Sequence, residues 1–187
     1  MTETIAQIIG IFAAAANILS FQCKSKNKII FIQFFGGTLF TVNFLMLGAL
    51  TGAIMNILAM VRAILFLYKD RLKLNDKILV IGFILAFITS YTLSFCVLGV
   101  EPTPKNFILE ALPIIGMSAA TVSFAMKNAT AVRLIGITLS SPPWLVYNVF
   151  VGSIGGMLCE AFSILSIAIG ILRHDIKRKP KIENTTE

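Results

Sequence analysis

The stretch PPWLVYNVFVGSIGG (142–156) places two adjacent prolines inside an apolar segment that is long enough to cross a membrane. An earlier stretch, GGTLFTVNFLMLGALTG (36–52), aligns with it so that Gly36-Gly37-Thr38 lie opposite Ser141-Pro142-Pro143. Asn43 lies opposite Asn148, and after a gap of one residue two glycines of each stretch also coincide. Because helix breakers, an asparagine and glycines agree in the same order, we interpret the two stretches as copies of one unit.

The similarity extends to the helix before each stretch, where QIIG (7–10) resembles PIIG (113–116) at an offset of 106 residues. Small and polar residues follow at matching positions with the spacing i, i+4 and i+7, so each set lies on one helix face: Gly10, Ala14 and Asn17 in the first unit, and Gly116, Ala120 and Ser123 in the second. Small residues at this spacing let two helices approach closely in lipid.

The composition indicates that the bilayer is the solvent for most of the chain. Of its 187 residues, 57% are hydrophobic and 13% are charged, whereas soluble domains carry about 25% charged residues. The net charge of +7 comes from short basic clusters between apolar runs, which is typical of cytoplasmic loops rather than of a nucleic-acid-binding face. The three cysteines are widely spaced, so we expect no disulfide framework, no metal site and no cofactor.

A membrane-spanning helix needs about 20 mainly apolar residues. Seven segments meet this requirement, at 4–22, 29–48, 52–68, 78–99, 108–126, 132–151 and 154–172. Fourteen of the sixteen lysine and arginine residues follow the first, third, fifth and seventh of these segments. The positive-inside rule therefore predicts an N-terminus outside and a C-terminus in the cytoplasm.

Each unit has three helices, so an extra helix must reverse the chain if both units are to face the same way. We therefore expect an all-α membrane protein in a 3+1+3 arrangement. It has two parallel triple-helix bundles at 1–73 and 101–175, a linker helix at 74–100 and a polar cytoplasmic tail at 176–187. Parallel repeats of this kind are related by an axis along the membrane normal, with a binding site near the midplane between them.

Three stretches resemble the YgjV family of bacterial inner-membrane proteins, which belongs with the SWEET, PQ-loop and PnuC superfamily of small transporters. They are ALPIIGMSAATVSFAMK (111–127), PPWLVYNVFVGSIGGMLCEAFSI (142–164) and the segment that runs from Gly48 into MVRAIL (60–65). The resemblance covers about 1–175. It implies the two-bundle transporter fold and a multi-pass location in the bacterial inner membrane.

In SWEET-like carriers, an asparagine pair on the third helices and aromatic residues of the second helices line the substrate cavity, and prolines act as hinges. The resemblance therefore implies a site at Asn56, Glu160 and Trp144, in which Glu160 replaces one asparagine and leaves the substrate open. Asn17 and Ser123, which match each other in the two units, are assigned to the same site. Hinges are predicted at Gly36, Gly37, Pro113, Pro142 and Pro143.

Two charged side chains, Arg62 and Glu160, lie well inside predicted spans, where insertion scales put the cost at roughly 2.5–3.5 kcal/mol each. An ion pair across the cavity accounts for both. Two independent roles, with Arg62 reaching the cytoplasmic headgroups, account for them equally well. Asn43, Asn148 and Glu110, near outer helix ends, are candidates for a gate, with capping, packing or an interfacial position as the alternative.

The pattern favours a small-molecule membrane transporter in which two bundles rock around a central site. The alternative is a non-transport membrane protein that keeps the fold, such as a sensor or a partner-binding or lipid-interacting protein. We expect no enzyme, because no predicted span contains histidine and no acidic cluster in the sequence suits a metal. The expected partners are membrane lipids and a small polar metabolite, not nucleic acid, and a homo-oligomer remains open.

Overall fold

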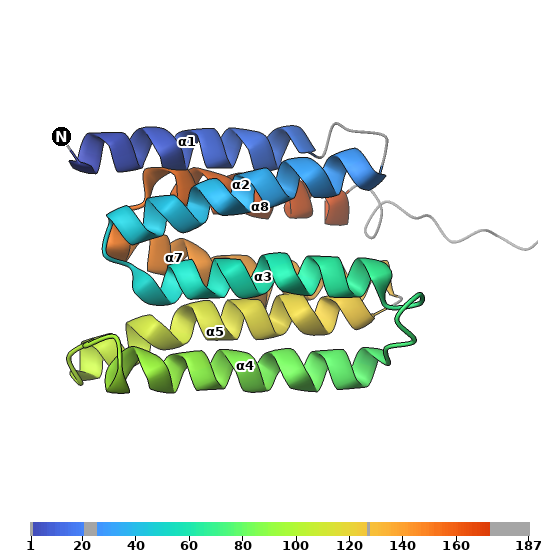
Figure 1. The fold of residues 1–187 in the computed structure, drawn as a ribbon. Coiled ribbons are helices and arrows are strands. Elements are labelled where there is room, and N and C mark those ends of the chain that lie inside the picture. The colour runs from blue at the N-terminus through green and yellow to red at the C-terminus, as the bar shows by residue number, and fades with distance from the viewer. Residues whose placement is uncertain (1, 21–25, 127, 173–187) are drawn as a thin grey trace, which may run out of the picture.

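The computed structural model describes residues 2–20, 26–126 and 128–172, and every regular element in this part of the chain is a helix. The elements are α1 (Thr2–Ser20), α2 (Lys26–Met46), α3 (Leu50–Tyr68), α4 (Asp76–Cys96), α5 (Pro104–Ala125), α6 (Ala129–Ile135), a π-helical segment η1 (Gly136–Ser140), α7 (Ser141–Val151) and α8 (Ile154–Ile171). α6, η1 and α7 follow one another without a break and form one long helix, so the described residues contain seven helices (Figure 1). The helices predicted from the sequence are confirmed, and the predicted tail at 176–187 lies outside the described residues.

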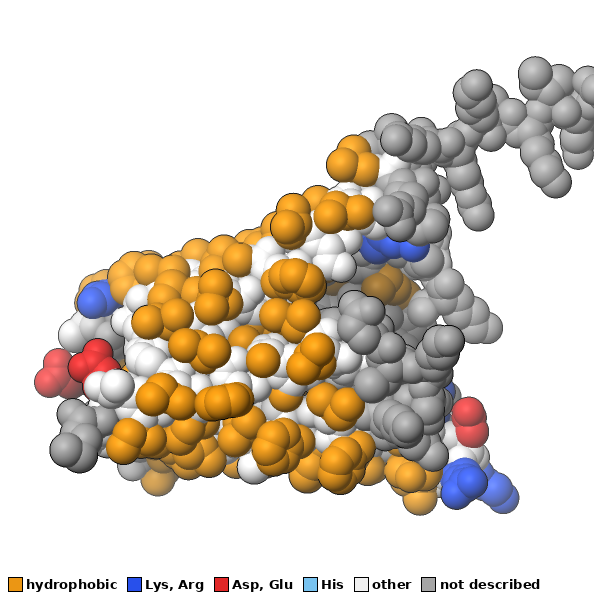
Figure 2. Space-filling model, turned by 90° about the horizontal axis from the view of Figure 1, so that it is seen from above, with side chains coloured by type: hydrophobic (Ala, Val, Ile, Leu, Met, Phe, Trp, Pro, Cys, Tyr) orange, Lys and Arg blue, Asp and Glu red, His pale blue; other side chains and the backbone are white. Residues whose placement is uncertain are grey.

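The exterior of these helices is apolar. Six of the helices among the described residues are long and apolar enough to cross a membrane, and α2 contributes a shorter apolar stretch, Phe31–Met46. Figure 2 shows hydrophobic side chains spread over one face of the molecule, while charged side chains gather at its two ends. Polar side chains such as Asn43, Thr51 and Ser153 are instead buried. An apolar outside around a polar inside is the arrangement that lipid requires.

Consecutive helices run antiparallel, so α1, α3, α5 and α8 point one way and α2, α4 and α7 the other (Figure 1). Six helices form a closed ring in which each packs on the next, in the order α1, α2, α3, α5, α7, α8 and back to α1. α4 stays outside the ring and packs on α3 and α5. Helices far apart in the sequence thus close the ring at two places, where α1 meets α8 and where α3 meets α5.

Two glycines that the sequence comparison aligns, Gly48 and Gly152, follow α2 and α7 with the same geometry. Both have a φ of +72°, a left-handed conformation that a residue with a Cβ rarely adopts. The next helix begins two residues later in each case, at Leu50 and at Ile154. The two aligned stretches therefore reverse the chain in the same way.

The two prolines of the later stretch interrupt the regular α-helix just before them. Pro142 and Pro143 have no N–H to donate to the carbonyls one turn earlier, and the preceding segment Gly136–Ser140 is π-helical. At the end of this segment the N–H of Ser141 donates to the carbonyl of Gly136, five residues back. The helix predicted at 132–151 is therefore α-helical at both ends, with a wider π-helical turn between them.

In the earlier stretch, the glycines leave α2 uninterrupted from Lys26 to Met46 and serve close packing instead. A Cβ at Gly36 would lie 3.2 Å from the side chain of Asn17 on α1, and a Cβ at Gly37 would lie 2.9 Å from Sδ of Met60 on α3. Pro113 is likewise buried within a continuous α5. The use of these three residues as hinges stays a prediction.

Candidate functional site

A cavity of about 160 Å³, called here the central cavity, lies on the axis of the ring. All six ring helices contribute to its wall, which makes it the place where the ring helices meet. It is lined by Asn17, Phe40, Phe44, Asn56, Met117, Trp144, Asn148, Gly156, Cys159 and Glu160.

Two hydrogen-bond acceptors distinguish this wall. Glu160 is the only charged residue among the described residues that line the central cavity, and its carboxyl lies near the Ser141 hydroxyl. Asn148 donates from Nδ2 to the carbonyl of Trp144 at 2.8 Å, whereas its Oδ1 is buried and has no partner in the described part of the chain. That oxygen lies against Gly156, where only a glycine leaves room for it.

Aromatic rings form another part of the wall. Phe44 on α2 and Trp144 on α7 stack with their ring centroids 6.1 Å apart. Tyr147 meets Trp144 edge-on at 5.7 Å and is completely buried behind it. The sequence comparison missed the α2 aromatics, because Phe44 lies opposite Val149 in the aligned stretch. Trp144 aligns with Leu39, so the sequence comparison gave it no aromatic partner on α2, whereas in the structure Phe44 is that partner.

A second cavity, of about 230 Å³, adjoins the central cavity and is called here the Arg62 cavity. Asn17 and Asn56 line both, so they mark the boundary between the two. Arg62 is 7% exposed, and its Nη1 donates to the carbonyl of Met117 at 3.1 Å and to Oγ1 of Thr121 at 2.7 Å. Its Nε is buried without a hydrogen-bond partner among the described residues.

Hydrogen bonds close the ring at the end where α1 begins, called here the sealed end. Nδ2 of Asn43 donates to the carbonyl of Ala6 at 2.7 Å, and Oγ of Ser153 donates to Oδ1 of Asn43 at 2.7 Å. Nε2 of Gln7 donates to the carbonyl of Gly152 at 2.7 Å. These bonds tie α1 and α2 to the turn between α7 and α8.

The opposite side of the sealed end is tied in the same way. The N–H of Gly52, in the first turn of α3, donates to the buried hydroxyl of Tyr147 on α7 at 3.0 Å. Thr51 and Ser94 share a hydrogen bond of 2.6 Å between their hydroxyls, which joins α3 to α4. The Glu110 carboxyl on α5 lies near Thr51, and its Oε2 is buried without a hydrogen-bond partner among the described residues. Both halves of the ring are therefore held together at this end by buried polar contacts.

The structure gathers four of the five residues assigned to substrate binding. Asn17, Asn56, Trp144 and Glu160 all line the central cavity. Ser123 lines neither the central cavity nor the Arg62 cavity, and its hydroxyl donates to the carbonyl of Ala119 within α5. Of the three gate candidates, Asn43 and Glu110 lie at the sealed end, while Asn148 lines the central cavity.

The structure does not form the charge pair between Arg62 and Glu160. Within the described residues, the only ion pair joins Lys69 to Asp76. Arg62 follows Asn56 by six residues, or about 9 Å of helix at 1.5 Å per residue, and its guanidinium contacts α5 instead of α8. The independent-role alternative for Arg62 also differs from the structure, because the side chain is buried rather than extended to the headgroups.

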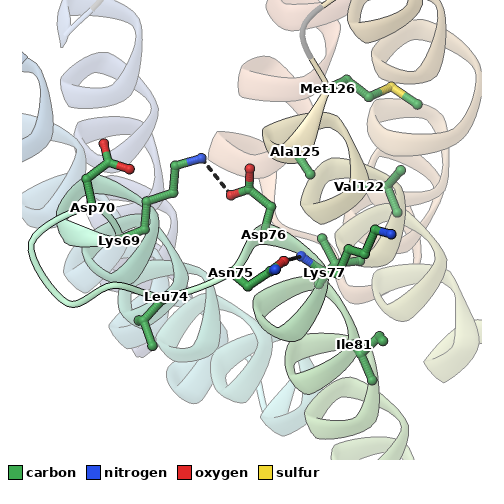
Figure 3. A pocket seen from close by; sticks show the side chains of 11 residues that line it. Lys69, Asp70, Leu74, Asn75, Asp76, Lys77, Ile81, Val122, Ala125 and Met126 are labelled. Carbon is green, nitrogen blue, oxygen red and sulfur yellow. Dashed lines mark hydrogen bonds and ion pairs between the residues drawn. The ribbon is translucent and has the colours of Figure 1, made fainter.

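A larger depression lies at the other end of the molecule and is separate from both cavities. It measures about 710 Å³ between the turn after α3, the start of α4 and the end of α5. Figure 3 shows the Lys69–Asp76 pair, 2.6 Å between Nζ and Oδ1, on one side and Met126 on the other. It shares no lining residue with the central cavity, so we do not assign it to the same site.

No group of three or more His, Cys, Asp or Glu residues suited to a metal occurs in residues 2–20, 26–126 and 128–172. No curated protein and no solved structure matches the chain. A family model described as a bacterial inner membrane protein, Imp-YgjV, matches residues 4–178, which include all seven helices. With that match and its apolar helices, the chain belongs to the Imp-YgjV family and is a multi-pass protein of the bacterial inner membrane.

Proposed function

We propose that the chain is a small-molecule carrier that works by alternating access, with its substrate bound in the central cavity. The observation that carries this proposal is the cavity itself. It lies where all six ring helices meet, and its wall combines Asn56, Trp144 and Glu160. A carrier needs a site that every moving part touches, because the site must pass from one side of the membrane to the other.

The ring supports a 3+1+3 arrangement of two parallel bundles. α1 runs in the same direction as α5, and α3 in the same direction as α8 (Figure 1). The first helix of each proposed bundle packs on the third helix of the other, as an axis along the membrane normal through the central cavity would require. α4 packs outside the ring, where a linker helix belongs. This arrangement is our reason for placing the chain with the SWEET, PQ-loop and PnuC superfamily.

The conformation corresponds to one half of a transport cycle. Buried hydrogen bonds of Asn43, Tyr147 and Ser153 close the sealed end, while the Arg62 cavity continues from the central cavity toward the opposite end. By the distribution of lysine and arginine, the sealed end faces outward. We therefore interpret this conformation as closed to the outside.

The other half of the cycle requires these bonds to break and the bundles to rock about their second helices. η1 is the proposed pivot in the second bundle, because the prolines after it remove backbone hydrogen bonds that would otherwise stiffen the helix. The glycine pair of α2 is the proposed pivot in the first bundle. Because these glycines have no side chain, α2 packs closely there on Asn17 and Met60 and can shift past them.

Flux through liposomes tests this function. Purified protein is reconstituted, and uptake of a panel of radiolabelled small polar metabolites is measured with and without ion gradients. Asn56→Ala should abolish uptake and leave the melting temperature within a few degrees of the wild type, because the Asn56 side chain lines both cavities and makes no hydrogen bond to another described residue. Thr92→Ala, on the exposed face of α4, is the matched control. Folded protein that moves none of the panel under any gradient would refute the carrier.

A non-transport role, as a sensor or a partner-binding or lipid-interacting protein, predicts a central cavity filled by side chains, Arg62 among them. The observed cavity is empty of Arg62, which turns toward α5. This observation favours the carrier. An enzymatic role is not proposed, and the partners proposed are a small polar metabolite and the surrounding lipid.

A further inference from the structure

Resting on the proposed function, we infer that the substrate is a linear zwitterion whose anionic group binds Arg62 and whose ammonium group binds Glu160. The two side chains carry opposite charges and line adjoining cavities. They form no ion pair with each other in the structure. A zwitterion supplies the counter-charge for each of them at once.

Arg62 is the anion-binding half of this site. Among the described residues, its guanidinium contacts only neutral groups, which are the Met117 carbonyl, the Thr121 hydroxyl and the ring of Phe124 at 4.9 Å. Buried charges are normally paired, and a guanidinium offers a carboxylate two parallel N–H donors. The buried Nε has no hydrogen-bond partner among the described residues, and Arg62 lines the cavity. A carboxylate in that cavity would therefore supply the counter-charge that the guanidinium lacks.

Glu160 forms the cation-binding half. Its carboxyl is the only charged group among the described residues that line the central cavity. The stacked rings of Phe44 and Trp144 line the same cavity. Carboxylate, amide oxygen and aromatic faces are the groups that bind an ammonium ion, which has only donors and a positive charge.

The distance between the two halves sets the length of the ligand. Arg62 lies about 9 Å along α3 from Asn56, which lines both cavities. An extended chain covers about 3.3–3.6 Å per residue, so the ligand needs the length of two to three residues. If this rise along α3 is taken as the span between the two charges, an α-amino acid is too short to reach both. An ω-amino acid of about five or six carbons, or a dipeptide, is long enough.

A ligand series on the purified wild-type protein tests the inference without any substitution. Thermal stabilisation is measured with ω-amino acids from glycine to 7-aminoheptanoate, and with the alkylamine and the alkanoate of each length. Stabilisation should peak at about five or six carbons, with the zwitterion binding about tenfold or more tightly than either single-charge analogue. Equal binding of the amine or the alkanoate, a series without a length optimum, or no binding by any member would overturn the inference.

Variants assign the two ends. Arg62→Met should abolish the preference for the zwitterion over the amine, and Glu160→Gln should abolish its preference over the alkanoate. Lys105→Met, which removes a cation near Phe150 in a different cavity, should keep both preferences. Arg62→Lys keeps the charge but not the two-donor fork, so it should bind the zwitterion more weakly while retaining the preference. If Arg62→Met and Arg62→Lys lose the same preference, the charge of Arg62 does not select the ligand.

The inference and the proposed function fail differently. Zwitterion binding without flux in liposomes would remove the carrier and keep the binding site. Flux of an uncharged solute, with no stabilisation by the zwitterion series, would keep the carrier and remove the inference.

Discussion

The hydrogen bond between Ser153 and Asn43 offers a direct test of whether the sealed end opens during a cycle. Ser153→Ala deletes a single oxygen atom, so it leaves almost no cavity behind. The deleted hydroxyl donates to Oδ1 of Asn43 at 2.7 Å and accepts the N–H of Gly156 at 3.2 Å. The first contact joins α2 to the α7–α8 turn, whereas the second caps α8 and moves with it.

These two contacts have different consequences. The loss of the cap should lower the free energy of unfolding by about 1 kcal/mol in any conformation. The loss of the bond to Asn43, which leaves its oxygen buried and unpaired, should cost the sealed conformation alone a further 1–3 kcal/mol or so. A shift of about 1–3 kcal/mol raises the population open at this end by roughly 5- to 150-fold.

Cys159 reports the opening, because it lines the central cavity. In a background of Cys23→Ser and Cys96→Ser, a membrane-impermeant maleimide is added from the side of the sealed end, and the rate of Cys159 labelling is measured. Ser163→Ala is the control, since the Ser163 hydroxyl donates only to the carbonyl of Cys159 within α8. Ser153→Ala should label faster by the factor above, and Ser163→Ala should not. A lowered melting temperature with unchanged labelling would refute a seal that opens.

Two further predictions concern the backbone. Gly155→Ala should destabilise the protein by about 1–3 kcal/mol or more, because its Cβ would collide with the backbone of Gly10 across the α1–α8 contact. Gly82→Ala on α4, where a Cβ meets nothing within 4 Å, should stabilise the protein slightly. Thermal melts compare the two variants, and equal melting temperatures would contradict the close contact. Replacing Pro142 and Pro143 together by alanine should preserve folding and slow uptake, because restored hydrogen bonds stiffen the helix at η1, and unchanged uptake would exclude a pivot there.

The helices were predictable from the sequence because the thickness and apolarity of the bilayer, rather than packing between helices, determine their length and hydropathy. The pairing of Gly48 with Gly152 was predictable for a similar reason, since a sharp reversal needs a left-handed residue at the same place in each stretch. Asn56, Trp144 and Glu160 were assigned to one cavity by the resemblance to SWEET-like carriers, and all three line the central cavity.

Individual side-chain contacts between helices were not predictable when the contacting residues had no counterpart in the repeat. Ser153 bonds to Asn43, yet Ser153 lies opposite Ala49 in the alignment, so no repeated pattern points to it. The side chain of Arg62 has several neighbours within reach, and its choice of Met117 and Thr121 depends on the packing of α3 on α5. Spacing along a helix fixes which face a residue occupies, but not which helix that face meets.

The closure of the ring bears on how the protein is made. α1 packs on α8, which is the last ring helix to be synthesised. Until synthesis reaches Ile171, α1 therefore has only α2 as a ring neighbour in the bilayer. A nascent chain stopped after α3 holds three helices whose polar faces, with Asn17, Asn43 and Asn56, have no second half to meet. The polar interior of the ring is therefore complete only once α8 has been inserted.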